Sequence, residues 1–287
     1  MNITVQNALA DAILGLFDSS SSPEIDAEIL LGHSLKQSRA WLLTYQEEEL
    51  SADQVAEFNN LVERRKNGEP IAYILGEREF WSLNLNVNSA TLIPRPETEI
   101  LVEVALEKAQ LPFQGIMSIA DLGTGSGAIA LALASELTNA FITATDKSND
   151  ALLVAKQNAE QLSLSNVEFI NSDWFGSLND HRFNIICSNP PYIENLDPHL
   201  QRGDLRFEPR SALASGVDGF FDLQYIISQA QQYLHHEGWL ILEHGFQQAE
   251  RTHSLLAAAG FTNINTREDY AGHPRITYGQ KPLIPNI

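Results

Sequence analysis

The sequence contains little of several features that define common protein classes. Its 287 residues include a single cysteine, Cys187, which excludes an internal disulfide framework and favours a reducing compartment. The eight histidines form no H-E-x-x-H or comparable pattern, and one cysteine cannot build a zinc site by itself, so we expect no metal. No G-x-S-x-G elbow is present, which argues against a serine hydrolase of that kind.

Basic residues and long apolar runs are also scarce. Eighteen Lys and Arg residues stand against 37 Asp and Glu residues, which gives a formal net charge of −19. Such an excess weakens any general affinity for phosphate backbones, although a local basic patch can exist inside an acidic protein. The N-terminus does not resemble a signal peptide and no long apolar stretch occurs, so we expect a cytoplasmic, soluble protein without membrane association.

The length and the local patterns predict three segments, since 287 residues exceed one average domain. Residues 1–75 show apolar positions at helical spacing, a Ser-Pro helix start at Ser22 and a capping-box pattern at Ser51, which predict a small helical bundle. Residues 76–90 alternate in polarity from Trp81 to Val87, which predicts a strand within a β-hairpin connector. Residues 91–287 form the third segment.

The third segment alternates short apolar runs with helical patterns. This order predicts parallel βαβ units, which belong to an α/β fold with a mostly parallel sheet and helices on both faces. Residues 261–266 and 275–279 read as a closing pair of strands, the last of them antiparallel. Cys187 falls within one predicted buried strand, and we interpret it as a core residue and not as a nucleophile.

The first chemical motif is the tetrapeptide at residues 189–192, here called the NPPY cradle. It follows the apolar run Phe183–Cys187, and two prolines end that run because proline cannot continue a ladder. The carboxyl ends of strands in open α/β sheets are where ligands bind. An asparagine side-chain oxygen and a proline backbone oxygen provide two acceptors for a planar NH2 group, and a tyrosine ring can pack against that group. We therefore predict a site for an amide or an exocyclic amine, formed by Asn189, Pro190, Pro191 and Tyr192.

The second motif is the glycine turn, residues 123–127, between an apolar strand and an apolar helix. Glycines permit close backbone approach to a ligand, and the start of the helix should offer free N–H groups. The spacing is G-x-G-x-G and no lysine follows, so neither the dinucleotide fingerprint nor a P-loop is present. A turn opening on Asp121 suits a positively charged cofactor such as S-adenosylmethionine. Asp146 ends the next strand about 20 residues on, where a carboxylate can accept from ribose hydroxyls. The predicted cofactor residues are Gly123, Thr124, Gly125, Ser126, Gly127 and Asp146.

These motifs, in this order and spacing, resemble those of class I S-adenosylmethionine-dependent methyltransferases that methylate amino groups. With Ile-Pro-Arg-Pro-Glu-Thr-Glu at residues 93–99 and Glu-Pro-Arg at residues 208–210, the chain resembles the HemK-type peptide chain release factor glutamine N5-methyltransferases over essentially its whole length. The resemblance implies a Rossmann-like domain with a seven-stranded sheet. It also implies methyl transfer from S-adenosylmethionine to the glutamine amide of the Gly-Gly-Gln motif in class 1 release factors, with S-adenosylhomocysteine as product.

The resemblance assigns roles to particular residues as well. A tryptophan closing the core and a tryptophan packing on adenine are equally compatible with the sequence around Trp174; the resemblance favours adenine contact, and Asp173 beside it can accept from the adenine amine. The segment Thr91–Glu99 is implied to lie over the cofactor. From the residues alone, residues 1–75 can be a stabilising appendage or a device for docking a macromolecular substrate, and the resemblance favours docking. The implied catalytic residues are Asn189, Pro190 and Tyr192, and Asn189 also lies on the cofactor side.

Two features leave alternatives open. The polar insertion at residues 193–218 is long enough to be functional, yet at least two of Arg206, Glu208 and Arg210 are expected to form only a surface charge network. The NPPY cradle also suits a flipped base, so methylation of adenine or another exocyclic amine in DNA or RNA is the alternative function. Acidic composition and the helical bundle argue against that alternative and against a nucleic-acid partner. A non-enzymatic binding module is disfavoured because both motifs are intact, and we expect a monomer.

Overall fold

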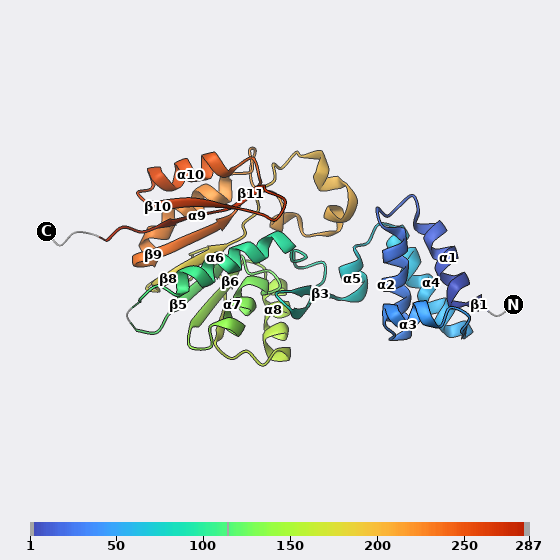
Figure 1. Cartoon of the computed structure of the whole chain (residues 1–287). Coiled ribbons are helices and arrows are strands. Elements are labelled where there is room, and N and C mark those ends of the chain that lie inside the picture. Colours follow the sequence, from blue (N-terminus) through green and yellow to red (C-terminus); the bar gives the residue numbers. More distant parts are fainter. Residues whose placement is uncertain (1–2, 114, 284–287) are drawn as a thin grey trace. The chain divides into compact units, whose positions relative to one another are not determined.

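The computed structural model describes residues 3–113 and 115–283, and it divides into two compact units. One unit holds the chain up to Glu77 together with the short segment Gln201–Phe207. The other holds Arg78–Leu200 and the chain from Glu208 onward. Figure 1 labels the helices and strands of both units.

The first unit is the helical bundle that the sequence predicted. Thr4 and Ser38 cap their helices through side-chain oxygens, and Ser51 and Gln54 form the predicted capping box. The apolar faces of the helices meet in a core that includes Leu30, Leu31 and Phe58. The elements are β1 (Ile3–Thr4), α1 (Val5–Leu16), α2 (Pro23–Leu35), α3 (Arg39–Thr44), β2 (Glu49–Leu50), α4 (Ala52–Lys66) and α5 (Ile71–Leu75).

The segment Gln201–Phe207 is fixed to this bundle by charged side chains. Arg65 is buried and donates to Asp26 at 2.7 Å and to Asp204 at 3.0 Å. Arg206 donates to the backbone oxygen of Asn67 at 2.7 Å. Gly68 has a φ of +90°, which favours glycine, and a Cβ there would displace the Arg206 guanidinium, 1.7 Å away. No sequence pattern predicted that this part of the insertion joins the bundle.

The second unit begins with a two-stranded sheet formed by β3 (Glu77–Phe80) and β4 (Leu83–Asn86). Trp81 and Ser82 both have positive φ, at 54° and 58°, and they form the turn between these strands. The alternating pattern was therefore wrong in including Trp81 in a strand, because a left-handed turn interrupts the alternation there. Leu85 and Val87 are buried, as the alternation predicted.

A seven-stranded sheet forms the centre of the second unit, in the order β10-β11-β9-β8-β5-β6-β7. Strands β7, β6, β5, β8 and β9 pair in parallel, and β11 pairs antiparallel with β9 and with β10. The predicted mostly parallel sheet with an antiparallel last strand is confirmed. The strands are β5 (Ser118–Leu122), β6 (Phe141–Asp146), β7 (Val167–Asn171), β8 (Phe183–Ser188), β9 (Leu234–Glu243), β10 (Thr262–Glu268) and β11 (Pro274–Gln280).

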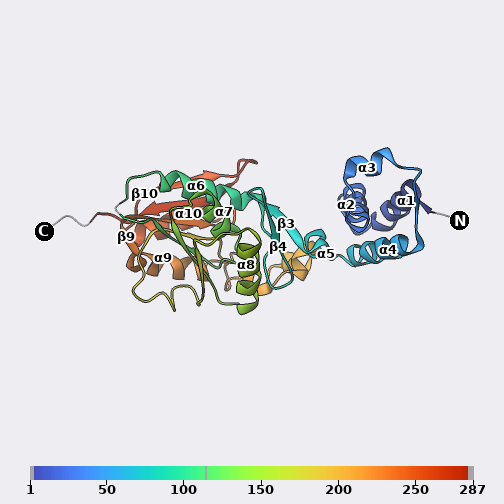
Figure 2. The ribbon, with the colours of Figure 1, turned by 90° about the horizontal axis from the view of Figure 1, so that it is seen from below.

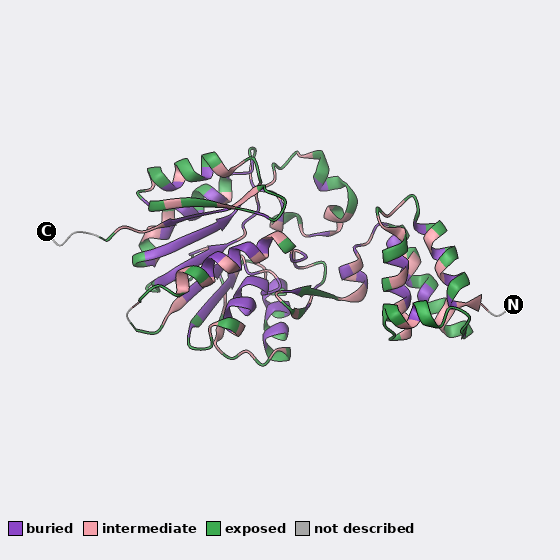
Figure 3. Cartoon of the chain, in the orientation of Figure 1, coloured by how far each residue is buried: buried purple, intermediate pink, exposed green. Residues whose placement is uncertain are grey.

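Helices cover both faces of this sheet, and the strands supply alternate side chains to each face (Figures 1 and 2). Ile119, Ile185 and Ile241 pack with the helices on one face, whereas Leu122, Ile186 and Leu242 pack with those on the other. Buried residues therefore dominate the central strands (Figure 3). The first face carries α6 (Glu99–Ala109), α7 (Ala128–Glu136) and α8 (Asn149–Gln161), and the second carries α9 (Phe221–Tyr233) and α10 (Ala249–Ala258).

No helix within residues 3–113 and 115–283 is long and apolar enough to cross a membrane. In that described part of the chain, no group of three or more His, Cys, Asp or Glu side chains is placed to hold a metal ion.

Candidate active site

The predicted motifs meet at one edge of the sheet because parallel strands end together there. Leu122 of β5 is in register with Ser188 of β8, and Ser188 is in register with Leu242 of β9. The glycine turn and the NPPY cradle therefore begin on adjacent strands. This edge is the ligand-binding edge of open α/β sheets.

The N–H groups of the glycine turn are used within the protein. Those of Gly123 and Thr124 donate to the Thr145 oxygen, and that of Gly127 donates to the Thr124 oxygen. The Gly125 N–H donates to Asp146 Oδ2 at 2.9 Å. The free N–H groups were expected at the start of the following helix, where the Ala130 N–H donates to Asp121 Oδ2 at 3.2 Å. A turn whose donors are satisfied is poorly suited to grip a pyrophosphate, which agrees with the absence of a P-loop pattern.

The three glycines of the turn all have positive φ, but their surroundings differ. A Cβ on Gly127 would press against Leu131 and Ala155, so this glycine serves helix packing. A Cβ on Gly123 would lie 3.3 Å from the Trp174 ring, whereas a Cβ on Gly125 would meet no atom within 4 Å. The open space beside Gly125, whose N–H donates to Asp146, is therefore where a ligand can approach the turn backbone.

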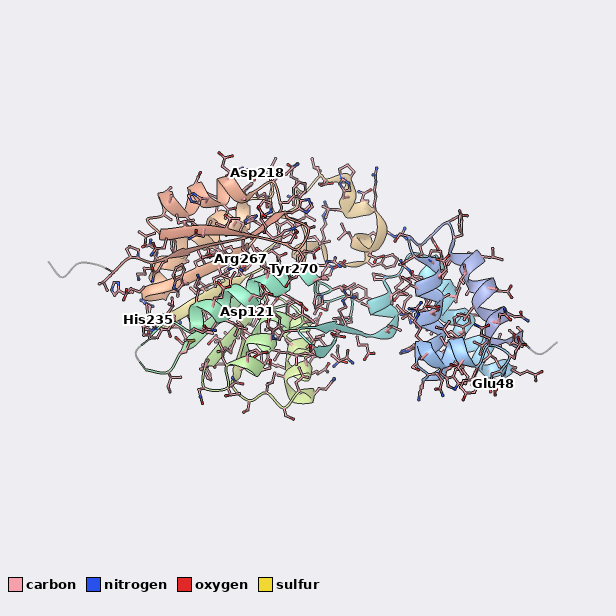
Figure 4. The ribbon with its side chains drawn as sticks, viewed as in Figure 1. Glu48, Asp121, Asp218, His235, Arg267 and Tyr270 are labelled. Carbon is pink, nitrogen blue, oxygen red and sulfur yellow. The ribbon has the colours of Figure 1, made fainter. Side chains whose placement is uncertain are left out.

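Asp121, which is labelled in Figure 4, joins the turn to the helix that follows it. Its Oδ2 accepts from the Thr124 hydroxyl at 2.6 Å and from the Ala130 N–H at 3.2 Å. Its Oδ1 is buried and has no hydrogen-bond partner among the described residues. Burial raises the pKa of the Asp121 carboxyl to about 7, against the lowering effect of those two hydrogen bonds. The Thr124 hydroxyl donates its proton to Asp121, so toward a ligand this hydroxyl can only accept.

Asp146 joins the glycine turn to the start of α8. Its Oδ1 accepts from the Ser148 N–H at 2.8 Å, and its Oδ2 accepts from Gly125. Burial raises the pKa of this carboxyl, and the backbone donors oppose the rise. Each carboxylate oxygen retains a further lone pair, so Asp146 can still accept from a ligand hydroxyl.

Trp174 lies beside the glycine turn, with its ring close to Gly123. Its backbone has a positive φ of 51°, and its Nε1 donates to Asp222 Oδ1 at 3.2 Å. The ring is half-buried and also packs on the core between the sheet and α9. The neighbouring Asp173 side chain is 65% exposed and pairs with Lys147 at 3.4 Å. The structure thus places Trp174 beside the glycine turn and orients Asp173 toward a surface lysine.

Asn189 follows β8 directly, as the sequence predicted. Its Nδ2 donates to the Thr98 hydroxyl at 3.2 Å. Because Nδ2 and Oδ1 belong to one amide group, this contact also decides which way Oδ1 points. Pro190 and Pro191 are buried behind it, and the Tyr192 backbone oxygen accepts from Gln248 Nε2 at 3.1 Å. The NPPY cradle is therefore held on both sides by side chains of other segments.

Two side chains of this region were not singled out from the sequence: Glu243, and Thr98 within the segment Thr91–Glu99 that the resemblance places over the cofactor. Glu243 ends β9, is buried, and accepts from the Thr98 hydroxyl at 2.7 Å and from the Tyr192 hydroxyl at 3.4 Å. Burial raises the pKa of the Glu243 carboxyl to about 7, with opposing effects from Thr98 and Arg275. Burial, followed by the nearby Glu243 charge, also raises the pKa of the Tyr192 hydroxyl, which therefore stays protonated. A carboxylate that ends an apolar strand at the ligand edge was the available signal, as it was for Asp146.

The charged residues of the insertion have different environments. Arg206 and Arg210 make exposed contacts with backbone oxygens, as expected of surface charges. Glu208 is instead buried, pairs with Arg95 and accepts from the Ile93 N–H at 3.2 Å. The loop that precedes α6 is thereby tied to the end of the insertion. Cys187 is buried within β8 and burial raises the pKa of its thiol, as expected of a core residue.

Family models match both parts of the chain. The model described as the PrmC N-terminal domain matches residues 7–76, and the one described as the methyltransferase small domain matches residues 96–204.

Whole proteins and solved structures give matches of two kinds. A release factor glutamine methyltransferase of Shewanella oneidensis is 49% identical over 276 residues, which cover 96% of each chain. A methyltransferase structure from Pyrococcus furiosus has a TM-score of 0.53 at 17% identity and covers 78% of this chain and 100% of its own. The T. thermophilus 16S rRNA N2 G1207 methyltransferase, solved with AdoMet and guanosine, has a TM-score of 0.50 at 20% identity, over 71% of this chain and 49% of its own. At these identities the two structures establish the fold, which is the predicted class I methyltransferase fold.

Proposed function

The chain belongs to the release factor glutamine methyltransferase family, and on this premise we propose that it methylates the side-chain amide nitrogen, N5, of a release factor glutamine. The proposed glutamine is that of the Gly-Gly-Gln motif in class 1 release factors, and the methyl donor is S-adenosylmethionine. One observation carries the proposal: the NPPY cradle begins on the strand next to the glycine turn. A methyl acceptor and a methyl donor can thus be held side by side at one edge of the sheet.

The surroundings of the glycine turn fit S-adenosylmethionine. The open space beside Gly125 adjoins the Asp146 carboxylate, which can accept from ribose hydroxyls, and the Trp174 ring beside Gly123 offers a face on which adenine can pack. The turn has few spare N–H donors, which suits a ligand with ammonium and sulfonium charges better than a polyphosphate. The residues proposed to hold the cofactor are Gly123, Thr124, Gly125, Ser126, Gly127, Asp146, Trp174 and Asn189.

The NPPY cradle has the acceptors that an amide substrate needs. S-adenosylmethionine supplies, when bound, a methyl group that is electrophilic because of its sulfonium. The amide nitrogen is a weak nucleophile, since its lone pair is delocalised into the carbonyl. Asn189 Oδ1 and the Pro190 backbone oxygen can accept its two hydrogens and turn the lone pair toward the methyl group. The same two oxygens favour the positive charge that develops on nitrogen, and the methylated nitrogen then loses a proton readily without a strong base in the site.

Docking of the release factor is proposed for the helical unit. A groove in this unit is lined by residues of α2, α4 and α5 and includes Ile25 and Ile29, which are 54% and 38% exposed. Exposed apolar side chains rimmed by charges are typical of protein-binding surfaces. Variants Ile25→Asp and Ile29→Asp should raise KM for the release factor and leave the affinity for S-adenosylmethionine unchanged; the exposed Leu14→Asp in α1 is the matched control.

The cellular setting is part of the proposal. A release factor substrate and a single free thiol support a cytoplasmic enzyme that acts on protein, and we propose that it is a monomer. The net charge of −19 argues against a nucleic-acid substrate. Light scattering at micromolar concentration measures the oligomeric state, and a stable dimer would contradict the proposal that the enzyme is a monomer.

The test is methyl transfer from labelled S-adenosylmethionine to parallel substrates. These are a purified class 1 release factor, its Gln→Ala variant at Gly-Gly-Gln, duplex DNA and ribosomal RNA. We expect label on the wild-type factor alone. Label on nucleic acid with an unlabelled factor would show that the cradle binds a base amine, which is the alternative function.

A further inference from the structure

The NPPY cradle works as an acceptor only if the Asn189 amide points the right way. An asparagine side chain has an acceptor oxygen on one side and a donor NH2 on the other, and a half-turn exchanges them. With Oδ1 toward the substrate, Asn189 accepts from an incoming amide NH2. With Nδ2 toward the substrate, two donors would face each other and the contact would be repulsive.

A chain of hydrogen bonds across three segments fixes this orientation. Above a pH of about 7 the Glu243 carboxyl is ionised and can only accept, so the single Thr98 hydroxyl proton then goes to Glu243 Oε2, at 2.7 Å. The Thr98 oxygen is left with lone pairs alone, so from its second partner it can only accept. That partner is the Asn189 amide, at 3.2 Å, and it must therefore present Nδ2.

We propose that Glu243 and Thr98 are positioning residues that hold Asn189 with Oδ1 toward the substrate amide. This inference rests on the proposed function, since it concerns the same cradle, and it assigns roles to two residues that do not touch the methyl acceptor.

Burial protects the hydrogen bond between Thr98 and Glu243 from competition with water. Glu243 and Thr98 are 1% and 4% exposed, so water does not replace either partner freely. Arg275 lies near enough to Glu243 to lower its pKa, but the ion pair of Arg275 is with Asp269, at 3.1 Å. The carboxylate is thus satisfied mainly by hydroxyl donors, of which Thr98 is the closest and Tyr192 the next.

The test compares variants that change single hydrogen bonds and keep side-chain shape. Thr98→Val removes the hydroxyl, Thr98→Ser keeps it, and Glu243→Gln replaces the obligatory acceptor by a group that can also donate. Thr143→Val is the matched control, because Thr143 is equally buried but lies within β6. Each variant is assayed for kcat on the release factor and for S-adenosylmethionine Kd.

We expect Thr98→Val to lower kcat about 10- to 100-fold, in the range found when a group that orients a functional side chain is lost. Thr98→Ser and Thr143→Val should stay within about 3-fold of wild type, and the cofactor Kd of all variants should change little. If Glu243 acts through Thr98, the double variant Thr98→Val/Glu243→Gln should be no slower than Thr98→Val alone. Losses that multiply in the double variant, or a Thr98→Val enzyme with wild-type kcat, would overturn the proposal.

A measurement without substrate separates this inference from the proposed function. In ¹⁵N-labelled protein, the side-chain amide signals of Asn189, assigned by their loss in Asn189→Ala, should exchange slowly in wild type and Thr98→Ser and rapidly in Thr98→Val. Unchanged exchange in Thr98→Val would refute the positioning role whatever the substrate is. If Thr98→Val does not fold, Thr98→Ala against Thr98→Ser gives the same contrast. A wild-type protein that shows the slow exchange but does not methylate the release factor would overturn the proposed function alone.

Discussion

The glycine turn and the NPPY cradle lie at the same edge of one sheet, yet they are held in different ways. The turn is fixed by hydrogen bonds between neighbouring segments. One example joins the Gly125 N–H to Asp146, which is 21 residues away in the sequence. The cradle is fixed by side chains from remote segments, since Asn189 and Thr98 are 91 residues apart and Thr98 and Glu243 are 145 apart. One site is therefore built mostly from backbone, and the other from side chains that the fold brings together.

This difference indicates what each site requires. A cofactor site needs a backbone shape, which glycines and a strand end provide locally. A site that must act on a weak nucleophile needs acceptors fixed in direction, and buried hydrogen-bonded side chains provide that. We therefore expect substitutions at the cradle to reduce turnover and substitutions at the turn to reduce cofactor affinity.

The largest effect is expected for Asn189→Ala. It removes one of the two proposed acceptors of the substrate amide, so kcat should fall about 100- to 1,000-fold, as when one preorganised electrostatic contact is lost. Steady-state kinetics with the release factor measures kcat, and calorimetric titration measures cofactor Kd, which should change far less. Unchanged turnover would remove Asn189 from the catalytic residues.

Asp146→Ala, at the glycine turn, should instead weaken the binding of S-adenosylmethionine. It removes a charged acceptor for the ribose and the partner of the Gly125 N–H, and such hydrogen bonds contribute about 1.5–3 kcal/mol, or about 10- to 100-fold in Kd. Equilibrium titration of S-adenosylmethionine measures this loss, with kcat at saturating cofactor as the control. A wild-type Kd would exclude Asp146 from the cofactor site.

Trp174→Leu should have a smaller effect of the same kind. Loss of a stacking partner costs about 0.5–1.5 kcal/mol, which corresponds to a Kd about 2- to 10-fold higher. The same titration reports it, and Trp81→Leu serves as control because Trp81 lies in the β3–β4 turn and donates to Glu136. Equal effects of both substitutions would indicate a general loss of folding.

Glu243→Gln provides a prediction about stability. The folded-state pKa of Glu243 is raised to about 7 from a usual value of 4.5, so between these pH values the folded state binds more protons than the unfolded state. The contribution of this carboxyl to stability is therefore greatest below pH 4.5 and is lost as the pH rises to 7. At pH 8, Glu243→Gln should unfold at an equal or higher temperature than wild type and still have a lower kcat. A lower Tm at pH 8 would mean that Glu243 stabilises the fold.

The sequence predicts those features that depend on local chemistry. The capping box at Ser51, the strand end before Asn189 and the carboxylate at Asp146 all follow from residues close together in the chain. The turn at Trp81 was not predicted, because an apolar residue in an alternating run gives no sign of a positive φ. The ion pair of Arg65 with Asp204 and the contact of Thr98 with Glu243 depend on how distant segments pack, and no local pattern contains that information.

In the proposed mechanism, the NPPY cradle directs a methyl group to one amide nitrogen. Tandem mass spectrometry of the release factor, after reaction with the enzyme and S-adenosylmethionine, locates the added methyl group directly. We predict that it lies on the side-chain amide of the Gly-Gly-Gln glutamine and is absent after reaction with the Asn189→Ala enzyme. A methyl group on any other residue, or on the same glutamine in equal yield without Asn189, would contradict the account.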